Sequence, residues 1–472
     1  MTRTIRHLGA AAVFAAAMGA ALLLSAPPAE AVPSFARQTG LACEACHTVF
    51  PELTAFGRRF KLNGYVLTTR QSVSDIDVSK QSTLSLADLP PLSAMLQAGV
   101  TVWNKAPADS GSPGTTAQNG NVQFPAQLAL FYGGKISDNM GSLFQVTLSQ
   151  TNSNTSFTID NSDIRYANHS ADNDWVYGVT VNNAPSVQDV WNSTPTWAGG
   201  ALAMSPSVGG PGSVVTASPL INTLQSHNVA GLGAYTFYKD SLYAEVSAYR
   251  TAQQGISTAV DSTVSGVISD AAPYWRLAYE QQWGKHNLEV GTFGMWAQYQ
   301  PNKGAVISPK QANTYTDAAL DAQYQYLDDD HMVTVLGSFL REDYRVNANN
   351  AASYANRNNA LNKAQLTATY YYQRKFGGSV NFTKLTGRAD PTFYPISSTA
   401  TSSSNGSPNS QYEVFELDYM PWLNTKLLLQ YTWYNQVNGV TGRGAPSTTG
   451  GGDTGRGVSD NNTVMVGLWT AF

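Results

Sequence analysis

Apolar and polar side chains alternate in many short segments of this chain, and this alternation constrains its fold more than any other feature. It is clear in segments 242–249 (LYAEVSAY), 318–325 (AALDAQYQ), 364–370 (AQLTATY) and 426–433 (KLLLQYTW). Successive side chains of a β-strand point to opposite faces, so each segment predicts a strand with one apolar and one polar face. Soluble β-sandwiches and membrane-spanning β-barrels both use such strands.

Composition favours the barrel. Only 13% of the 472 residues are charged, whereas Gly, Tyr and small polar residues are plentiful. Beyond the amino-terminal leader there is no apolar run of about 18 residues, which a membrane-spanning helix needs. A closed barrel is the other structure that crosses a bilayer with its backbone groups hydrogen-bonded.

The spacing of the expected strands supports the same fold class, a mainly β chain. Between Ser93 and Phe472 we count about sixteen antiparallel strands, with long and short connections in turn. The expected short turns are 138–141, 239–241, 284–286, 328–330, 376–378 and 421–424. An even strand number with short turns on one side predicts a transmembrane barrel of the Gram-negative outer membrane, with both chain ends on the periplasmic side. The segment from Val464 to Phe472 has the apolar alternation of a closing strand, although Thr470 interrupts it. An exported soluble β-protein is the alternative.

The amino terminus predicts export. Arg3, Arg6 and His7 precede an apolar run from Leu8 to Leu24 and a small-residue site that ends at Ala31. This is the pattern of a secretory signal peptide at 1–31.

Cys43-Glu44-Ala45-Cys46-His47 is a CxxCH motif, and its two cysteines are the only ones in the chain. In this motif the two thiols form thioethers with the vinyl groups of a haem, and the histidine is the proximal iron ligand. The sequence therefore predicts one covalent haem c on Cys43 and Cys46, with His47 as a metal ligand. A redox-active or structural CxxC pair is the alternative, and it does not account for the histidine.

We expect a small α-helical monohaem cytochrome c segment at 32–70, a linker at 71–92 and the barrel at 93–472. Ser34 is expected to cap a short helix before the motif, and Pro51 to begin a second helix that stops at Asn63-Gly64. A segment this short rarely folds alone, so we expect the haem and the barrel lumen to stabilise it. Three apolar residues on one face of the second helix are expected to pack on the haem: Leu53, Phe56 and Phe60.

Residues 32–94 contain no methionine and no histidine except His47, so a second strong iron ligand has few sources nearby. Met95 has the strand parity of Gln97 and Thr101, which are expected to face the lumen, and we predict that it is the distal ligand. A methionine that only fills the lumen is the alternative. Other candidate ligands are Lys61, the mature amino terminus and three histidines in expected periplasmic turns, His169, His286 and His331.

The haem-carrying segment and the barrel have opposite net charges, which favours docking of one in the other. Residues 32–70 have five basic and two acidic side chains, a net charge of +3, and the rest of the mature chain has 21 basic and 29 acidic, a net charge of −8. Arg58, Arg59 and Lys61 are candidates to pair with haem propionates, although exposed helix charges are the commoner case. The mildly acidic chain has no basic stripe, so no nucleic-acid partner is expected. By strand parity nine charged residues face the lumen: Arg165, Glu245, Arg276, Glu280, Glu289, Asp321, Glu416, Asp418 and Lys426.

Five segments of the chain carry a resemblance to a known family: FARQTGLACEACH, FPELTAFGRRFKLNGY, GKISDN, DNSDIRYAN and VNNAPSVQDVWNSTPTW. In these segments the chain resembles the fused outer-membrane cytochrome-porin family, best known as the iron oxidase of iron-oxidising bacteria. The resemblance covers nearly the whole mature chain. It implies one covalent c-type haem on a short domain inside or beneath a sixteen-strand porin, which takes electrons from extracellular Fe(II) and passes them to periplasmic carriers. Cys43, Cys46 and His47 match the family's haem motif. The iron-oxidising members continue with a Phe-Gln-His-Phe-Pro type run where this chain has Thr48-Val49-Phe50-Pro51, so it resembles a branch whose donor need not be iron.

We therefore expect an electron-transfer protein in contact with outer-membrane lipid. It would carry electrons from an extracellular donor, with Fe(II) as one candidate, to a periplasmic cytochrome or copper protein, as an Fe(II):cytochrome oxidoreductase if it is an enzyme. The alternative is a diffusion porin whose haem domain is structural or regulatory. A redox enzyme acting on a small molecule in the lumen is a third hypothesis, and no base, nucleophile or second metal cluster supports it.

Overall fold

The computed structural model describes residues 34–48, 52–67, 91–105, 119–120, 122–151, 154–185, 215, 217–224, 229–252, 266–300, 312–349, 354–394, 396, 403, 405–442 and 457–472. The expected signal peptide at 1–31 lies outside these residues. So does most of the expected linker at 71–92, of which only 91 and 92 are described.

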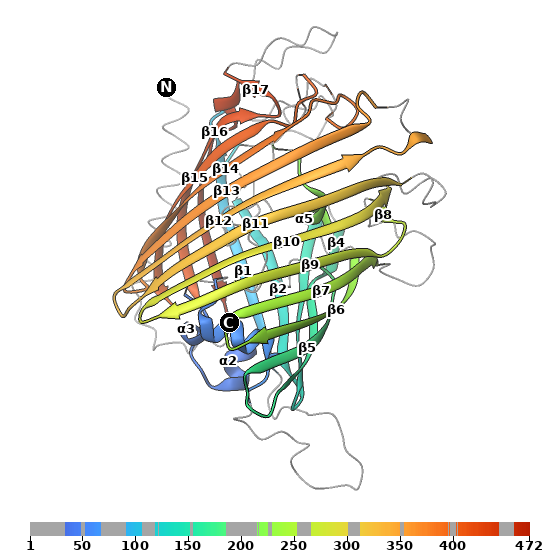
Figure 1. Ribbon diagram of the computed structural model, residues 1–472. Helices are drawn as coiled ribbons and strands as arrows, with labels where there is room; N and C mark the ends of the chain where they lie inside the picture. Colours follow the sequence, from blue (N-terminus) through green and yellow to red (C-terminus); the bar gives the residue numbers. More distant parts are fainter. Residues whose placement is uncertain are drawn as a thin grey trace.

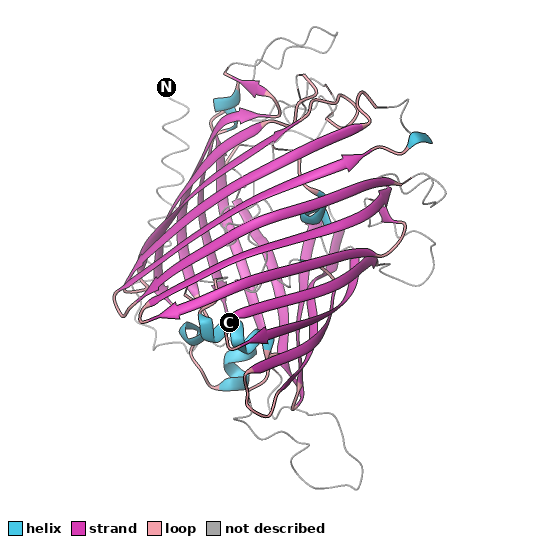
Figure 2. Cartoon of the chain, in the orientation of Figure 1, coloured by secondary structure: helices cyan, strands magenta, loops and turns pink. Residues whose placement is uncertain are grey.

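The strands form a closed antiparallel barrel (Figures 1 and 2). Within the described residues one sheet contains 18 strands, of which β8 (Val267–Ile268) and β17 (Val440–Thr441) have two residues each, and the remaining 16 make up the wall. The predicted fold class of about sixteen strands is confirmed. The wall strands are β1 (Leu92–Trp103), β2 (Val122–Ser137), β3 (Met140–Thr151), β4 (Asn154–His169), β5 (Trp175–Asn182), β6 (Val229–Tyr238), β7 (Leu242–Thr251), β9 (Ala272–Trp283), β10 (His286–Gln300), β11 (Asn313–Leu327), β12 (His331–Arg345), β13 (Asn358–Tyr372), β14 (Phe376–Gly387), β15 (Ser410–Trp422), β16 (Thr425–Val437) and β18 (Thr463–Ala471).

The barrel closes where the last strand pairs with the first. In the β1–β18 ladder Met95 lies opposite Ala471 and Gln97 lies opposite Trp469. The ladder reaches the chain end, because Ala94 N–H donates to Phe472 O at 2.7 Å and Phe472 N–H donates to Ala94 O at 2.9 Å. The expected closing strand is therefore confirmed.

The two faces of the wall differ in the way the alternation predicts. On β9 the inward side chains are at most 6% exposed and the outward ones are 39–50% exposed: Tyr274, Arg276, Ala278 and Glu280 inside, Trp275, Leu277 and Tyr279 outside. The nine charged residues predicted to face the lumen are all buried. The outer surface is thus apolar and aromatic, as contact with lipid requires.

Short turns join the strands at one end of the barrel. The turns at 138–139, 239–241, 284–285 and 328–330 are where the sequence predicts them, and Lys239 and Asp240 both take a positive φ of 50° in a tight hairpin. One prediction is displaced, since residues 376–378 belong to β14 and the turn is at 373–375. The turn predicted at 421–424 is shorter, at 423–424, because Pro421 and Trp422 belong to β15. At the other end, only residues 152 and 153 separate β3 from β4, so the expected rule of long connections fails there.

Three short helices lie at the short-turn end: α2 (Ser34–Thr39), α3 (Cys43–Cys46) and α4 (Ala55–Leu62) (Figure 1). Ser34 is the first residue of α2 and not its cap. The second helix begins later than predicted, since the Thr54 hydroxyl is the N-cap and accepts from Gly57 N–H at 3.1 Å. It ends as expected at Asn63, and Gly64 follows with a φ of +72°.

Where the structure describes the rest of the chain, two further helical segments are α5 (Leu220–Leu224) and the 3-10 turn η4 (Val458–Asn461). The amino end of α5 meets the inner wall, because Leu220 N–H donates to Glu342 at 2.5 Å and Ile221 N–H donates to Asp317 at 2.8 Å. The helix α5, which follows β5 and precedes β6, therefore lies in the lumen. In the described part of the chain, no helix has the length and apolar character to cross a membrane.

The apolar outward face predicts that a charged substitution destabilises the barrel by an amount that depends on its depth in the bilayer. Leu320, in the middle of β11, is 64% exposed, and Leu242, at the short-turn end of β7, is 49% exposed. Leu320→Arg should lower the free energy of unfolding in lipid vesicles by about 2–4 kcal/mol, because the guanidinium enters the hydrocarbon. Leu242→Arg is the matched control, with an expected loss of about 0–1 kcal/mol. Equal losses in urea titrations of the two variants would contradict the placement of this surface in a bilayer.

Candidate functional site

Helices α2, α3 and α4 form a plug, residues 34–48 and 52–67, in the short-turn mouth of the barrel (Figure 2). Its contacts extend around the wall. Ser34 Oγ lies 2.8 Å from Ser93 Oγ on β1, and Tyr65 O–H donates to Asp163 on β4 at 2.7 Å. Tyr235 O–H on β6 donates to the carbonyl of Leu62 at 2.7 Å.

Arg58 is the most fully bonded side chain of the plug. It is 1% exposed and its guanidinium contacts both oxygens of Glu280 on β9. It also donates to Asn287 at 2.9 Å, to Gln325 at 3.2 Å and to the carbonyl of Leu53 at 2.7 Å. A buried charge is tolerated when it is paired and its donors are used, so this network fixes α4 against β9, β10 and β11.

The plug is also held at the rim by exposed ion pairs. Arg59 pairs with Asp240 in the β6–β7 turn, and Glu44 pairs with Arg374 in the β13–β14 turn at 3.2 Å. Exposed pairs of this kind contribute little individually. The buried Arg58 network is therefore the main polar anchor.

The CxxCH motif forms a compact unit with α4. Cys43 and Cys46 are the first and last residues of α3, both are half-buried, and neither forms a disulfide. Burial raises the pKa of both thiols, that of Cys46 to about 11, so both are protonated. A Cβ on Gly57 would lie 2.2 Å from the carbonyl oxygen of Cys46, so only glycine allows α3 and α4 to pack this closely.

The His47 imidazole is held in one orientation. Its Nδ1 lies 3.2 Å from the carbonyl oxygen of Glu52, which fixes Nδ1 as the protonated nitrogen of a neutral ring. Burial lowers the pKa of His47 to about 4, and the hydrogen bond to Glu52 opposes only part of this effect. In this tautomer Nε2 carries the lone pair. A metal-ligating histidine usually donates its other ring N–H to a carbonyl or carboxylate in this way.

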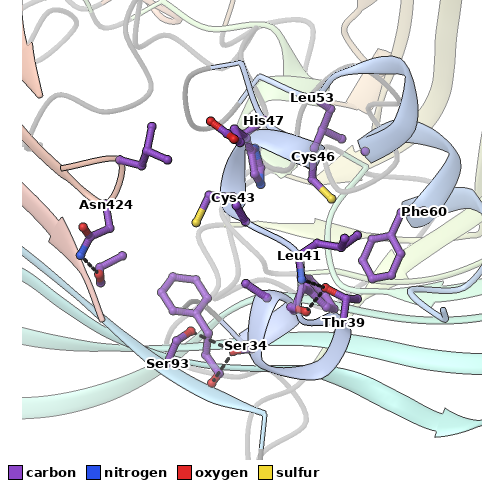
Figure 3. Close-up of a pocket in the computed structure, with 18 of the residues that line it drawn as sticks. Ser34, Thr39, Leu41, Cys43, Cys46, His47, Leu53, Phe60, Ser93 and Asn424 are labelled. Carbon is purple, nitrogen blue, oxygen red and sulfur yellow. Dashed lines mark hydrogen bonds between the residues drawn. The ribbon is translucent and has the colours of Figure 1, made fainter. Parts of the chain in front are cut away.

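A pocket opens between the plug and the wall, next to this motif (Figure 3). Its empty space is about 1450 Å³, open mouth included. Cys43, Cys46 and His47 line it, and Figure 3 shows the two sulfur atoms projecting from α3. The wall contributes residues from β1, β2, β3, β4, β15 and β18: Ser93, Met95, Phe131, Leu143, Gln145, Asn161, Met420, Trp469 and Ala471.

The residues present fit a c-type haem. Two thiols one helical turn apart and a neutral histidine open on a mainly apolar pocket, which is the donor set and environment that a thioether-linked haem needs. Leu53 and Phe60 line the pocket as expected. Phe56 does not, and it is 43% exposed, although it lies one turn before Phe60 in α4.

Met95 is buried, faces the lumen and lines the same pocket as His47, in agreement with its strand parity. The three alternative histidines do not line this pocket. His286 Nδ1 lies 2.7 Å from the Tyr324 hydroxyl, and His331 Nδ1 lies 2.9 Å from the Tyr370 hydroxyl. His169 stands at the end of β4.

Sequence reasoning missed Met420, the second buried methionine of the pocket. The sequence does indicate that Met420 points inward, since it has the strand parity of Glu416 and Asp418, which are predicted to face the lumen. Its nearness to His47 depends on how the plug sits in the barrel, and no local pattern encodes that.

Among the comparisons with known proteins, only the one with solved structures finds matches to this chain. No protein family model and no curated protein matches it. The outer membrane channel DcaP of Acinetobacter baumannii is 13% identical over 81% of this chain and 96% of that chain, with a TM-score of 0.43. The anion-selective porin from Comamonas acidovorans is 12% identical over 81% and 98%, with a TM-score of 0.41. OmpT of Vibrio cholerae is 9% identical over 84% and 100%, with a TM-score of 0.41.

Removing the buried anchor should release the plug. Arg58→Gln leaves Glu280 buried beside a neutral side chain, so the free energy of opening α4 should fall by about 3–5 kcal/mol. Hydrogen exchange of the α4 amides measures this opening. Arg59→Gln, which removes an exposed charge from the next residue of the same helix, is the control, with an expected change below about 1 kcal/mol. Similar exchange in both variants would show that Arg58 does not anchor the plug.

Proposed function

We propose that this chain is an outer-membrane electron-transfer protein, with one haem c attached to Cys43 and Cys46 and ligated by His47 in the plug of the barrel. The observation that carries the proposal is the CxxCH motif beside an apolar pocket that the barrel wall completes. The apolar outer belt and the short-turn end favour an outer-membrane barrel with the plug at its periplasmic mouth. Haem supplies a one-electron couple when it is bound there.

The chain's own residues support this role. His47 offers Nε2 because its Nδ1 is held by the Glu52 carbonyl. Leu53, Phe60 and Phe131 shield the pocket from water. An exposed apolar side chain, Leu41, lies at the pocket mouth, where a periplasmic cytochrome or copper protein can approach.

A filled lumen favours electron transfer over free diffusion. On β11 the inward residues from one end of the strand to the other, Asn313, Asp321 and Gln325, are at most 6% exposed. The plug adds its contacts at the short-turn mouth. These inward side chains are covered along the length of the strand, which favours a packed lumen over an open channel.

The second candidate is a diffusion porin whose haem segment is structural or regulatory. The specific observation in its favour is the closed sixteen-strand barrel, an architecture large enough for an aqueous channel. Solute passage through it would require that the plug move.

Reduction by an outside donor tests the leading proposal. We expect the ferric holoprotein in vesicles to be reduced by Fe(II) or another reductant added on the long-connection side, and then oxidised by a soluble carrier on the other side. Stopped-flow absorbance in the Soret region measures both steps. On a denaturing gel stained for haem, Cys43→Ala with Cys46→Ala should lose the signal that the wild type gives, because no thioether can form. Haem that stays with the denatured double variant would refute attachment through these two cysteines.

Conductance separates the two candidates. In planar bilayers we expect the intact protein to pass little current and the Arg58→Gln variant to pass more. Large steady conductance of the intact protein, together with no reduction by any external donor, would favour the porin.

The distal ligand can be assigned by comparing two methionines of the pocket. We propose Met95, so Met95→Ala should abolish the methionine-to-iron charge-transfer band of the ferric holoprotein, and Met420→Ala should leave it intact. The reverse result would assign Met420. An unchanged spectrum in both variants would exclude both.

A further inference from the structure

Glu52 connects the His47 imidazole to the wall of the barrel. Its backbone carbonyl oxygen lies 3.2 Å from His47 Nδ1 and also accepts from Thr48 N–H at 3.3 Å. A short antiparallel bridge between His47 and Leu53 keeps the two segments side by side (Figure 3). The imidazole is therefore oriented by residues 52 and 53, which lie outside the CxxCH motif.

The Glu52 carboxyl is bound by hydroxyl groups of the plug and of the wall. Thr48 O–H donates to it at 2.9 Å. Thr334 on β12 and Thr369 on β13 form side-chain hydrogen bonds to the same carboxyl, and both face the lumen and are at most 8% exposed. Ser379 Oγ lies 3.1 Å from Thr369 Oγ1, so it can donate to Thr369 while Thr369 donates to Glu52. The carboxyl is thus a shared acceptor that joins the plug to two strands.

The backbone next to Glu52 is held by the same part of the wall. The carbonyl oxygen of Leu53 accepts from Arg58 at 2.7 Å and from Gln325 on β11 at 3.2 Å. Glu52 and Leu53 are therefore bound by three consecutive strands, β11, β12 and β13. A metal-ligating histidine is oriented by the acceptor of its other ring N–H. That acceptor can orient the ring only if it is fixed itself, and here the wall fixes it.

A carboxylate suits this position better than a neutral amide. Its two oxygens have about four acceptor sites and can serve several hydroxyl donors, whereas an amide side chain has one oxygen. Lys426 on β16 also attracts the Glu52 carboxyl. Its ammonium is shared with Glu416 at 2.8 Å and Asp418 at 3.6 Å, so the hydroxyls are the contacts that fix the direction of the carboxyl.

We propose that Glu52 is a positioning residue that sets the orientation of the His47 imidazole relative to the barrel wall, with Thr334 and Thr369 as its fixed contacts. The inference deepens the proposed function and rests on ligation of haem by His47. A ligating imidazole can rotate about its bond to iron, and the plane that it adopts controls how its orbitals overlap with those of the metal. Docking of the plug in the barrel therefore sets the electronic structure of the iron.

Nuclear magnetic resonance of the full-length chain in lipid nanodiscs, prepared without haem, tests the positioning directly. The ¹⁵N shifts of the His47 ring distinguish a single tautomer, protonated at Nδ1, from an exchanging mixture of tautomers. The wild type should show the single tautomer, and Glu52→Ala should show the mixture. Thr334→Val with Thr369→Val should also show the mixture, because it keeps the shape of both side chains and removes both hydroxyls.

Thr334→Ser with Thr369→Ser is the matched control. It keeps both hydroxyls, so its His47 ring should remain in the single tautomer. If Glu52→Ala does not fold, the comparison of the two double variants decides. A single tautomer in the double valine variant, or a mixture in the wild type, would overturn the inference.

The holoprotein distinguishes failure of this inference from failure of the proposed function. The shifts of the haem methyl protons in the ferric state depend on the plane of the ligating imidazole. The double valine variant should change their order or spread, and the double serine variant should not. Unchanged shifts in the double valine variant would overturn the positioning role while haem attachment stands. Wild-type protein without covalent haem, measured as pyridine haemochrome, would refute the proposed function and with it the ligation on which the inference rests.

Discussion

Closure of the barrel by β1 and β18 is the constraint on which the rest of the structure depends. It removes the free edges of the sheet, which would otherwise expose unpaired backbone groups to lipid or to other chains. It also builds the site, because Ser93 and Met95 from β1 and Trp469 and Ala471 from β18 line one side of the pocket. The first and last strands of the wall thus form both the seam and part of the proposed cofactor environment.

The plug is placed by specific polar contacts more than by its net charge. The opposite charges of plug and barrel favour encounter, but they do not fix an orientation. Arg58 does so through a guanidinium whose planar donors meet Glu280, Asn287 and Gln325 on adjacent strands. Gly57 then lets α3 lie against α4, so the position of Arg58 determines where the CxxCH unit faces the wall.

Residue orientations that follow the strand periodicity could be predicted from the sequence, whereas positions set by packing between distant segments could not. A period of two identifies the inward face of β9 and the burial of Met95 because each strand is regular. The turn at 373–375 was displaced because Phe376, Gly377 and Gly378 look like a turn, yet cross-strand pairing with β15 keeps them in β14. Phe56 was misplaced because a shared helix face does not ensure burial: Phe60 packs against Phe35 and Tyr65, and Phe56, one turn earlier, is exposed. Met420 and Lys61 became pocket residues only through docking of the plug, and contacts between distant segments leave no local pattern.

The composition of the pocket wall has a consequence for biogenesis. Its residues come from the two ends of the chain and from several strands between them, so the pocket wall is complete only when β18 pairs with β1. Under the proposed function, thioether formation at Cys43 and Cys46 would need only the short segment around α3. Maturation of the proposed haem would then precede insertion of the cylinder, and the wall would be assembled around a segment that already carries its prosthetic group.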